Sequence, residues 1–184
     1  MDSPPQSLLC FAFTDVEGST ALWAEQPHAM IWATERLDDI VGKIVTGRGG
    51  TVVKERGEGD SHFIVFPSAT PAVHACAELA GAVDSEPWPD ELDLKIRIGI
   101  HVGDAITQGG DYYGLAVNQT TRIRGLGHGG QVLASQAVVE IAEHLVDGDL
   151  QFRSHGTPRV GGFNRRRGIL PVGGGGLPSE FPGL

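Results

Sequence analysis

The chain places a carboxylate directly after a short apolar run, in the segment FTDVEGST at residues 13–20. Residues 8–13 have the composition of a buried strand, and the small residues after Asp15 lead into helix-prone sequence. This order predicts that Asp15 lies at the rim of a sheet, beside free backbone N–H groups at a helix start. A carboxylate oxygen next to such donors suits a hard divalent cation and the phosphate that it carries.

A second carboxylate, Asp60, lies in a glycine-rich link, GEGDS at residues 57–61, between two further strand-like runs. Two carboxylates at neighbouring strand ends would give a metal–triphosphate site its oxygen ligands. The simpler alternative for Asp15 is a carboxylate that caps a helix. We favour the metal site because a carboxylate recurs at Asp60.

The apolar periodicity predicts an α+β fold, a mixed and mainly antiparallel sheet with helices packed on it. Strands are expected at 8–15, 51–54, 61–66, 92–102, 131–134 and 150–154, and helices at 19–23, 27–46, 68–83, about 115–125 and 135–145. Ser19 and Ser135 are expected to cap helices, and residues 109–114 are expected to form a turn. The short link after residue 54 predicts an antiparallel hairpin.

The composition bounds the class of protein. The 184 residues are 40% hydrophobic and 20% charged, which is ordinary for one globular domain. A net charge of −9 argues against direct binding of nucleic acid, which needs clustered Lys and Arg. Cys10 and Cys76 lie in apolar segments without a metal-binding spacing, and this favours reduced core thiols in a cytoplasmic protein.

The two ends of the chain differ in composition from the rest. We expect a flexible N-terminus at 1–7, one domain over 8–172, and a Gly/Pro-rich linker or tail over 173–184. No run reaches the roughly 20 apolar residues of a membrane helix, so no membrane association is expected.

Four further motifs follow in a fixed order: RIGIHVG at 97–103, GDYYG at 110–114, VNQTTR at 117–122 and GGQVL at 129–133. With these and the two carboxylate segments, residues 8–163 resemble the class III adenylyl/guanylyl cyclase catalytic domain. The chain is most similar to a bacterial, mycobacterial-like subgroup that often accompanies ATPase or helix-turn-helix regulators. The resemblance implies a ferredoxin-like sheet covered by helices, and a head-to-tail homodimer with two active sites at its interface.

The resemblance assigns the metal site to Asp15, Val16 and Asp60, which would hold two divalent cations, Mg²⁺ or Mn²⁺. One cation would also lower the pKa of the ribose 3′-OH, which attacks the α-phosphate in line and expels pyrophosphate. The residues that follow Asp15 would contact the substrate: Glu17, Gly18, Ser19 and Thr20.

Asn118 and Arg122 match the family's transition-state pair, and their spacing places both on one helix face. The Asn118 amide would orient the ribose, and the Arg122 guanidinium would stabilise charge on the α-phosphate. Asp111 matches the position that reads the base. A carboxylate there accepts from the adenine 6-amino group and repels the guanine carbonyl, which favours ATP over GTP. The alternative for Asp111 is a plain turn residue.

The chain departs from the family at two lysines. Either Lys54 or Arg56 matches the second base-reading residue, depending on whether the hairpin bulges. Gly161 stands where a phosphate-binding lysine is usual, and Arg159 is the nearest substitute. Losing one charge-assisted contact costs about 1.5–3 kcal/mol, so a weak cyclase is expected.

These residues lead us to expect a homodimeric adenylyl cyclase that makes cyclic AMP and pyrophosphate from ATP. The first alternative is a weak or inactive cyclase-like domain that binds nucleotide or dimerises and so regulates a partner. The second is a guanylyl cyclase, which Asp111 disfavours.

Overall fold

The computed structural model describes residues 6–53, 59–89, 92–146, 148–153, 168–178 and 180–182. The strands are β1 (Gln6–Val16), β2 (Thr51–Val53), β3 (His62–Phe66), β4 (Ile96–Gln108), β5 (Asp111–Tyr113), β6 (Val132–Ser135), β7 (Gln151–Phe152) and β8 (Ile169–Gly173). The helices are α1 (Ser19–Glu25), α2 (Pro27–Gly47), α3 (Ala69–Ser85), α4 (Leu115–Arg124) and α5 (Gln136–Ala142). The expected α+β class is confirmed.

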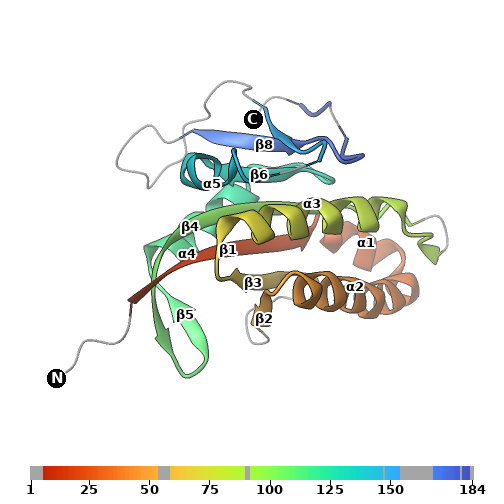
Figure 1. The fold of residues 1–184 in the computed structure, drawn as a ribbon. Coiled ribbons are helices and arrows are strands. Elements are labelled where there is room, and N and C mark those ends of the chain that lie inside the picture. The colour runs from red at the N-terminus through yellow and green to blue at the C-terminus, as the bar shows by residue number, and fades with distance from the viewer. Residues whose placement is uncertain are drawn as a thin grey trace.

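The strands form one sheet in the order β2-β3-β1-β4-β6-β8-β7, with β5 paired to β4 (Figure 1). The β4–β6 pair is parallel and the other pairs are antiparallel. The central β1–β4 ladder runs from Gln6 opposite Ile106 to Val16 opposite Ile96. Residues 13–16 of the segment FTDVEGST therefore lie beside the start of the RIGIHVG motif, in the middle of the sheet.

The two faces of the sheet carry different cores, because successive strand residues point to opposite faces. The larger core lies under α2 and α3, which cover one face, and it includes Cys10, Ile64 and Ile100. Figure 1 shows α3 crossing this face over β1 and β4. The smaller core on the other face joins Phe11 and Phe63 to the first turn of α4.

Helix α4 lies very close to β4 because two glycines leave room for it. A Cβ atom on Gly99 would lie 2.3 Å from the backbone N of Arg124, and one on Gly103 would lie 2.7 Å from the Cβ of Ala116. Both distances are far below van der Waals contact, so the glycines fix the position of α4 on the sheet.

Three expectations about local structure were wrong. Helix α1 begins after Gly18, whose φ is 69°, and Ser19 does not cap it. Strand β4 begins at Ile96 and runs to Gln108, beyond the expected end at residue 102. The expected turn at 109–114 is a hairpin, in which Gly109 and Gly110 have positive φ and Asp111 begins β5. The expected cap at Ser135 is confirmed, since its hydroxyl accepts the Val138 N–H.

Candidate active site

Asp15 and Asp60 come from adjoining strands. Thr14 of β1 pairs with His62 of β3. Asp15 lies one residue after Thr14 and Asp60 lies two residues before His62, so both lie at the same end of this antiparallel pair. Both carboxylates are nearly buried, at 9% and 8% exposed. The prediction that these two carboxylates come from neighbouring strand ends agrees with this register. Val16 is also buried, and because its side chain has no ligand atom, only its backbone could serve a cation.

The carboxylate of Asp15 forms ion pairs with two arginine side chains. Arg97, directly opposite on β4, donates from Nε to Oδ1 at 2.7 Å and from Nη2 to Oδ2 at 2.9 Å. These hydrogen bonds raise the pKa of Arg97, and the charges of Asp15 and Glu17 add to the rise. A second guanidinium, that of Arg124, has its Nε 3.5 Å from Oδ2 of Asp15.

The carboxylate of Asp60 differs from that of Asp15 in its hydrogen-bond partners. Its Oδ2 atom is buried and has no hydrogen-bond partner among the residues that the structure describes. A buried carboxylate oxygen without a partner is costly unless a cation or a donor satisfies it. Oxygen donors of this kind fit Mg²⁺ or Mn²⁺, although the described residues hold no cluster of three or more His, Cys, Asp or Glu side chains.

The residues that follow Val16 lie at the surface, whereas the Asp15 carboxylate is nearly buried. Glu17 donates its N–H to the Lys95 carbonyl, and Gly18 makes the left-handed turn into α1. Glu17 and Thr20 are exposed, and Ser19 is half-buried. These expected substrate contacts therefore border the carboxylate site along the chain.

Asn118 and Arg122 lie on the outer side of α4. Both are exposed, whereas Ala116, Val117 and Ile123 of the same helix pack inward. The four-residue spacing thus presents both polar side chains away from the chain's own sheet. Groups that face outward in this way can act on a substrate held partly by another molecule.

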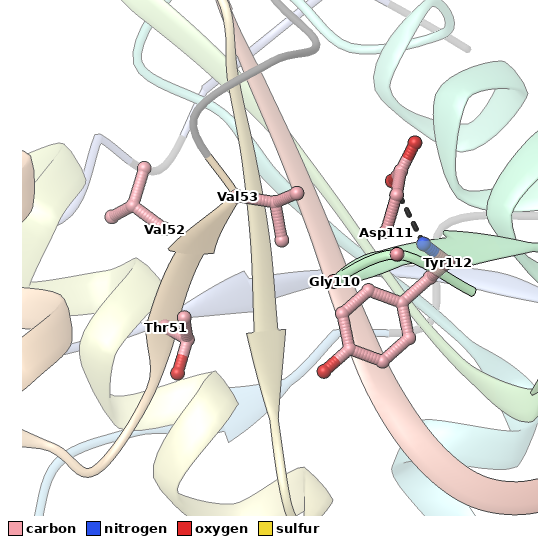
Figure 2. A pocket seen from close by; sticks show the side chains of 7 residues that line it. Thr51, Val52, Val53, Gly110, Asp111 and Tyr112 are labelled. Carbon is pink, nitrogen blue, oxygen red and sulfur yellow. Dashed lines mark hydrogen bonds between the residues drawn. The ribbon is translucent and has the colours of Figure 1, made fainter. Parts of the chain in front are cut away.

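Asp111 lies in a different part of the molecule, at the β4–β5 hairpin. It lines a cavity of about 250 Å³ together with Thr51, Val52, Val53, Gly109, Gly110 and Tyr112. Its Oδ1 accepts the Tyr112 N–H at 2.7 Å, and Figure 2 shows Val53 and Tyr112 on the two sides of the gap. Strand β2 ends there at Val53, so the chain enters the Lys54–Arg56 segment beside this cavity. Lys54, Arg56, Arg159 and Gly161 themselves lie outside the described residues.

The two carboxylates expected to bind metal and the aspartate expected to read the base lie at opposite ends of β4. Asp15 is paired with Arg97 and Asp111 with Gln108, eleven residues apart, which is about 35 Å of strand path. One nucleotide does not span that length. A single chain therefore does not bring all of the expected site residues to one substrate.

The sequence did not predict a role for Arg97 or Arg124, which both contact Asp15. Arg97 stands inside a motif that was used only for the resemblance, and its register with Asp15 follows from the β1–β4 pairing. His62, which the sequence left without a role, lies on the α2 face of the sheet. There it bonds Thr14 Oγ1 at 3.1 Å and Asp38 Oδ1 at 2.8 Å. His101 is a buried core residue that bonds Ser135.

The comparisons with known proteins agree with this architecture. The family described as the adenylate and guanylate cyclase catalytic domain matches residues 1–169. An uncharacterized protein of Mycobacterium tuberculosis is 31% identical over 181 residues, which is 98% of this chain and 61% of that protein. An adenylate cyclase of Schizosaccharomyces pombe is 31% identical over 168 residues, which is 78% of this chain and 10% of that protein.

Solved structures share the fold. An adenylate cyclase from Trypanosoma brucei, solved in its monomeric state, superposes with a TM-score of 0.82 at 23% identity, over 97% of this chain and 92% of that one. An adenylate/guanylate cyclase/hydrolase from Silicibacter pomeroyi gives a TM-score of 0.81 at 22% identity, over 96% and 100% of the two chains.

The chain belongs to the class III adenylyl/guanylyl cyclase catalytic domain family. It is a nucleotidyl cyclase domain, and it spans about three-fifths of the length of its mycobacterial relative. None of the helices that the structure describes is both long and apolar enough to cross a membrane.

Proposed function

We propose that this domain is an adenylyl cyclase that converts ATP to 3′,5′-cyclic AMP and pyrophosphate. The observation that carries the proposal is the pair of buried carboxylates on adjoining strand ends, one of which, Asp60, has an oxygen without a partner among the described residues. A buried acidic pair of this kind is suited to cations that accompany a triphosphate.

Each side chain then has a part in the reaction. Asp15, Asp60 and the backbone of Val16 would hold two cations, which when bound neutralise the triphosphate and favour ionisation of the ribose hydroxyl. The Asn118 amide orients the ribose, and the Arg122 guanidinium faces the α-phosphate. A bond forms from the 3′ oxygen to the α-phosphorus, the bond to pyrophosphate breaks, and the hydroxyl proton leaves to solvent.

The substrate preference rests on the cavity at the β4–β5 hairpin. The Oδ1 atom of Asp111 accepts from the chain itself, while the carboxylate as a whole borders the cavity. A carboxylate at its wall would accept from the 6-amino group of adenine and repel the guanine carbonyl. Lys54 or Arg56, which follow β2 in the sequence, is the expected donor to the base.

The proposed active unit is a homodimer. The carboxylate site and the Asp111 cavity are at opposite ends of β4, so each complete site would combine the carboxylates of one copy with Asp111, Asn118 and Arg122 of the other. The exposure of Asn118 and Arg122 on α4 supports this arrangement, because both side chains are accessible to a second copy of the chain.

A second candidate function is a regulatory domain that binds nucleotide without turning it over. The engagement of Asp15 by Arg97 favours it, because a carboxylate that is already neutralised is a poorer cation ligand. The missing lysine at Gly161 favours it as well.

The test is product formation by the purified protein from ATP or GTP, each with Mn²⁺ and with Mg²⁺. We expect cyclic AMP from ATP, and a loss of at least about 100-fold in Asp60→Asn, because a metal ligand is removed without a change of shape. Asp93→Asn is the matched control, since that carboxylate is 80% exposed.

Bound ATP without any cyclic product, in the wild type and at saturating metal, would favour the regulatory domain. Cyclic GMP as the main product would overturn the role of Asp111. An Asp60→Asn variant with the wild-type rate would overturn the metal site.

A further inference from the structure

The two metal carboxylates differ in their charge balance within one small region. Both oxygens of Asp15 accept from Arg97, at 2.7 and 2.9 Å, while Oδ2 of Asp60 accepts from none of the described residues. Asp15 is therefore compensated within the chain, whereas none of the described residues donates a hydrogen bond to Oδ2 of Asp60. Two carboxylates with the same surroundings would not differ in their hydrogen-bond partners in this way.

Arg124 adds a second positive charge to the same carboxylate. Its Nε atom lies 3.5 Å from Asp15 Oδ2, which is an ion pair but too long for a good hydrogen bond. That nitrogen is buried and has no hydrogen-bond partner among the described residues. The Nε–H group of Arg124 therefore lies near Asp15 without forming a hydrogen bond to it.

The elements explain why both guanidinium groups meet there. Arg97 is opposite Asp15 in the β1–β4 register. Arg124 ends α4, and the backbone of Arg124 rests on Gly99, two residues along β4 from Arg97. Arg124 therefore reaches Asp15 from the last residue of α4, the helix that also carries Asn118 and Arg122.

We propose that Arg97 and Arg124 form a latch on Asp15, which a polyphosphate opens by taking the two guanidinium groups. This proposal rests on the metal site of the proposed function. Phosphate oxygens accept from guanidinium in the same two-pronged geometry as a carboxylate, so the exchange conserves the hydrogen bonds of Arg97 and supplies the missing partner of Arg124. Asp15 is then free to bind a cation.

The latch has a thermodynamic consequence. While it is closed, a divalent cation meets two positive charges at Asp15 and only Asp60 is available to it, so cation binding is weak. A polyphosphate raises the affinity for the cation, and by linkage the cation raises the affinity for the polyphosphate by the same factor. The site in this way selects the metal–triphosphate complex over either component.

A purely structural ion pair would look different. Arg36 and Glu86, which join α2 to the end of α3, make two hydrogen bonds of 2.8 and 3.0 Å. The latch has the same bidentate pair, but Arg124 adds a buried Nε atom that has no hydrogen-bond partner among the described residues.

The experiment measures two ligands on the same variants of the full chain. Mn²⁺ binding without polyphosphate is followed by the electron paramagnetic resonance of the free ion, and inorganic tripolyphosphate binding without metal is followed by calorimetry. Tripolyphosphate has no ribose, so neither measurement depends on turnover. The variants are Arg124→Gln, Arg124→Lys and Arg97→Gln, with Arg48→Gln as control because Arg48 pairs with Glu78 on the surface.

We expect Arg124→Gln to bind Mn²⁺ more tightly and tripolyphosphate more weakly, each by roughly 5- to 150-fold. Arg97→Gln should act in the same two directions, Arg124→Lys should give smaller changes, and Arg48→Gln none. Thermal unfolding of each variant checks that it folds, and Arg124→Lys keeps the test decisive where a glutamine variant does not fold.

Opposite changes for cation and anion are the signature of the latch. A variant that weakens both ligands, or leaves Mn²⁺ binding unchanged, overturns it. Asp60→Asn separates this outcome from a failure of the proposed function. If that variant binds Mn²⁺ as the wild type does, the metal site itself is wrong; if cyclic AMP is never formed but the opposite changes appear, the latch stands.

Discussion

Gly99 occupies a point on β4 where no side chain fits. A Cβ there would lie 2.3 Å from the backbone N of Arg124 and 2.9 Å from the carbonyl oxygen of Thr120. We expect Gly99→Ala to lower the free energy of unfolding by about 1–3 kcal/mol, because the clash is with backbone and α4 must move. The measurement is urea unfolding together with the cyclase rate.

Gly42→Ala in α2 is the control for this prediction. No atom lies within 4 Å of the added methyl group there, so the helix should be unchanged or stabilised by up to about 1 kcal/mol. Because α4 carries Asn118 and Arg122, the Gly99 variant should lose more activity than stability alone explains. Equal stability of the two alanine variants would contradict this account of α4 packing.

The residues that could be predicted from the sequence are those whose chemistry is local. Asp15 lies in the last two residues of its strand, and Asn118 and Arg122 share a helix face through their spacing alone. The ion pair between Arg97 and Asp15 joins residues 82 positions apart. It depends on β1 lying beside β4, a strand order that short-range periodicity does not determine.

Strands β1 and β3 and helix α2 are joined by a buried polar network next to the carboxylate site. Thr14 Oγ1 accepts the His62 N–H at 3.2 Å and also bonds Nδ1 of that ring, and Nε2 bonds Asp38 of α2. Since a carboxylate only accepts, Nε2 of His62 donates to Asp38. The network fixes α2 against the strand ends that hold Asp15 and Asp60.

We expect Thr14→Val to lower the free energy of unfolding by about 1–3 kcal/mol, because it leaves buried groups of His62 unpaired at nearly constant volume. Asp38→Asn should cost less, since that side chain is 65% exposed and screened by water. Thr34→Val, which removes hydroxyl bonds to the Met30 and Ile31 carbonyls within α2, is the control. Denaturant unfolding gives all three values, and a larger loss in Asp38→Asn than in Thr14→Val would reverse the proposed order.

At this scale the sequence predicted most elements but missed two strands. Strand β5 is only three residues long, and its glycine-rich start has the composition of a turn. Strand β8, Ile169–Gly173, contains Pro171 and Gly173, and it forms because β6 and β7 pair with its two edges. Tertiary pairing overrides weak local preference in both strands.

The whole molecule shows a sheet with its chemistry at two ends. The carboxylates lie near the start of β4, and Asp111 lies at the tip of the hairpin that extends from the other end (Figure 1). Large apolar side chains are exposed around that hairpin and the start of α4: Leu8, Ile106, Tyr113 and Leu115. An exposed apolar group of this kind beside polar site residues suits a protein–protein interface.

Complementation between two inactive variants tests whether the sites are shared. Asp15→Ala and Asn118→Ala homodimers should both be inactive, because each lacks one half of both sites. In a head-to-tail heterodimer the two lesions fall in the same site, and the other site is intact. An equal mixture that exchanges freely should therefore recover about one quarter of the wild-type rate, since half of the dimers are mixed and each has one working site.

A mixture of Asp15→Ala with Asp60→Ala is the control, because both substitutions strike the carboxylate half and no intact site can form. Subunit exchange is verified with two affinity tags before the rates are compared. No recovery in the first mixture despite exchange would place the complete site within one chain. That result could be reconciled with the structure only if Asp111 took no part in the reaction, because β4 holds it at the far end of the sheet from Asp15.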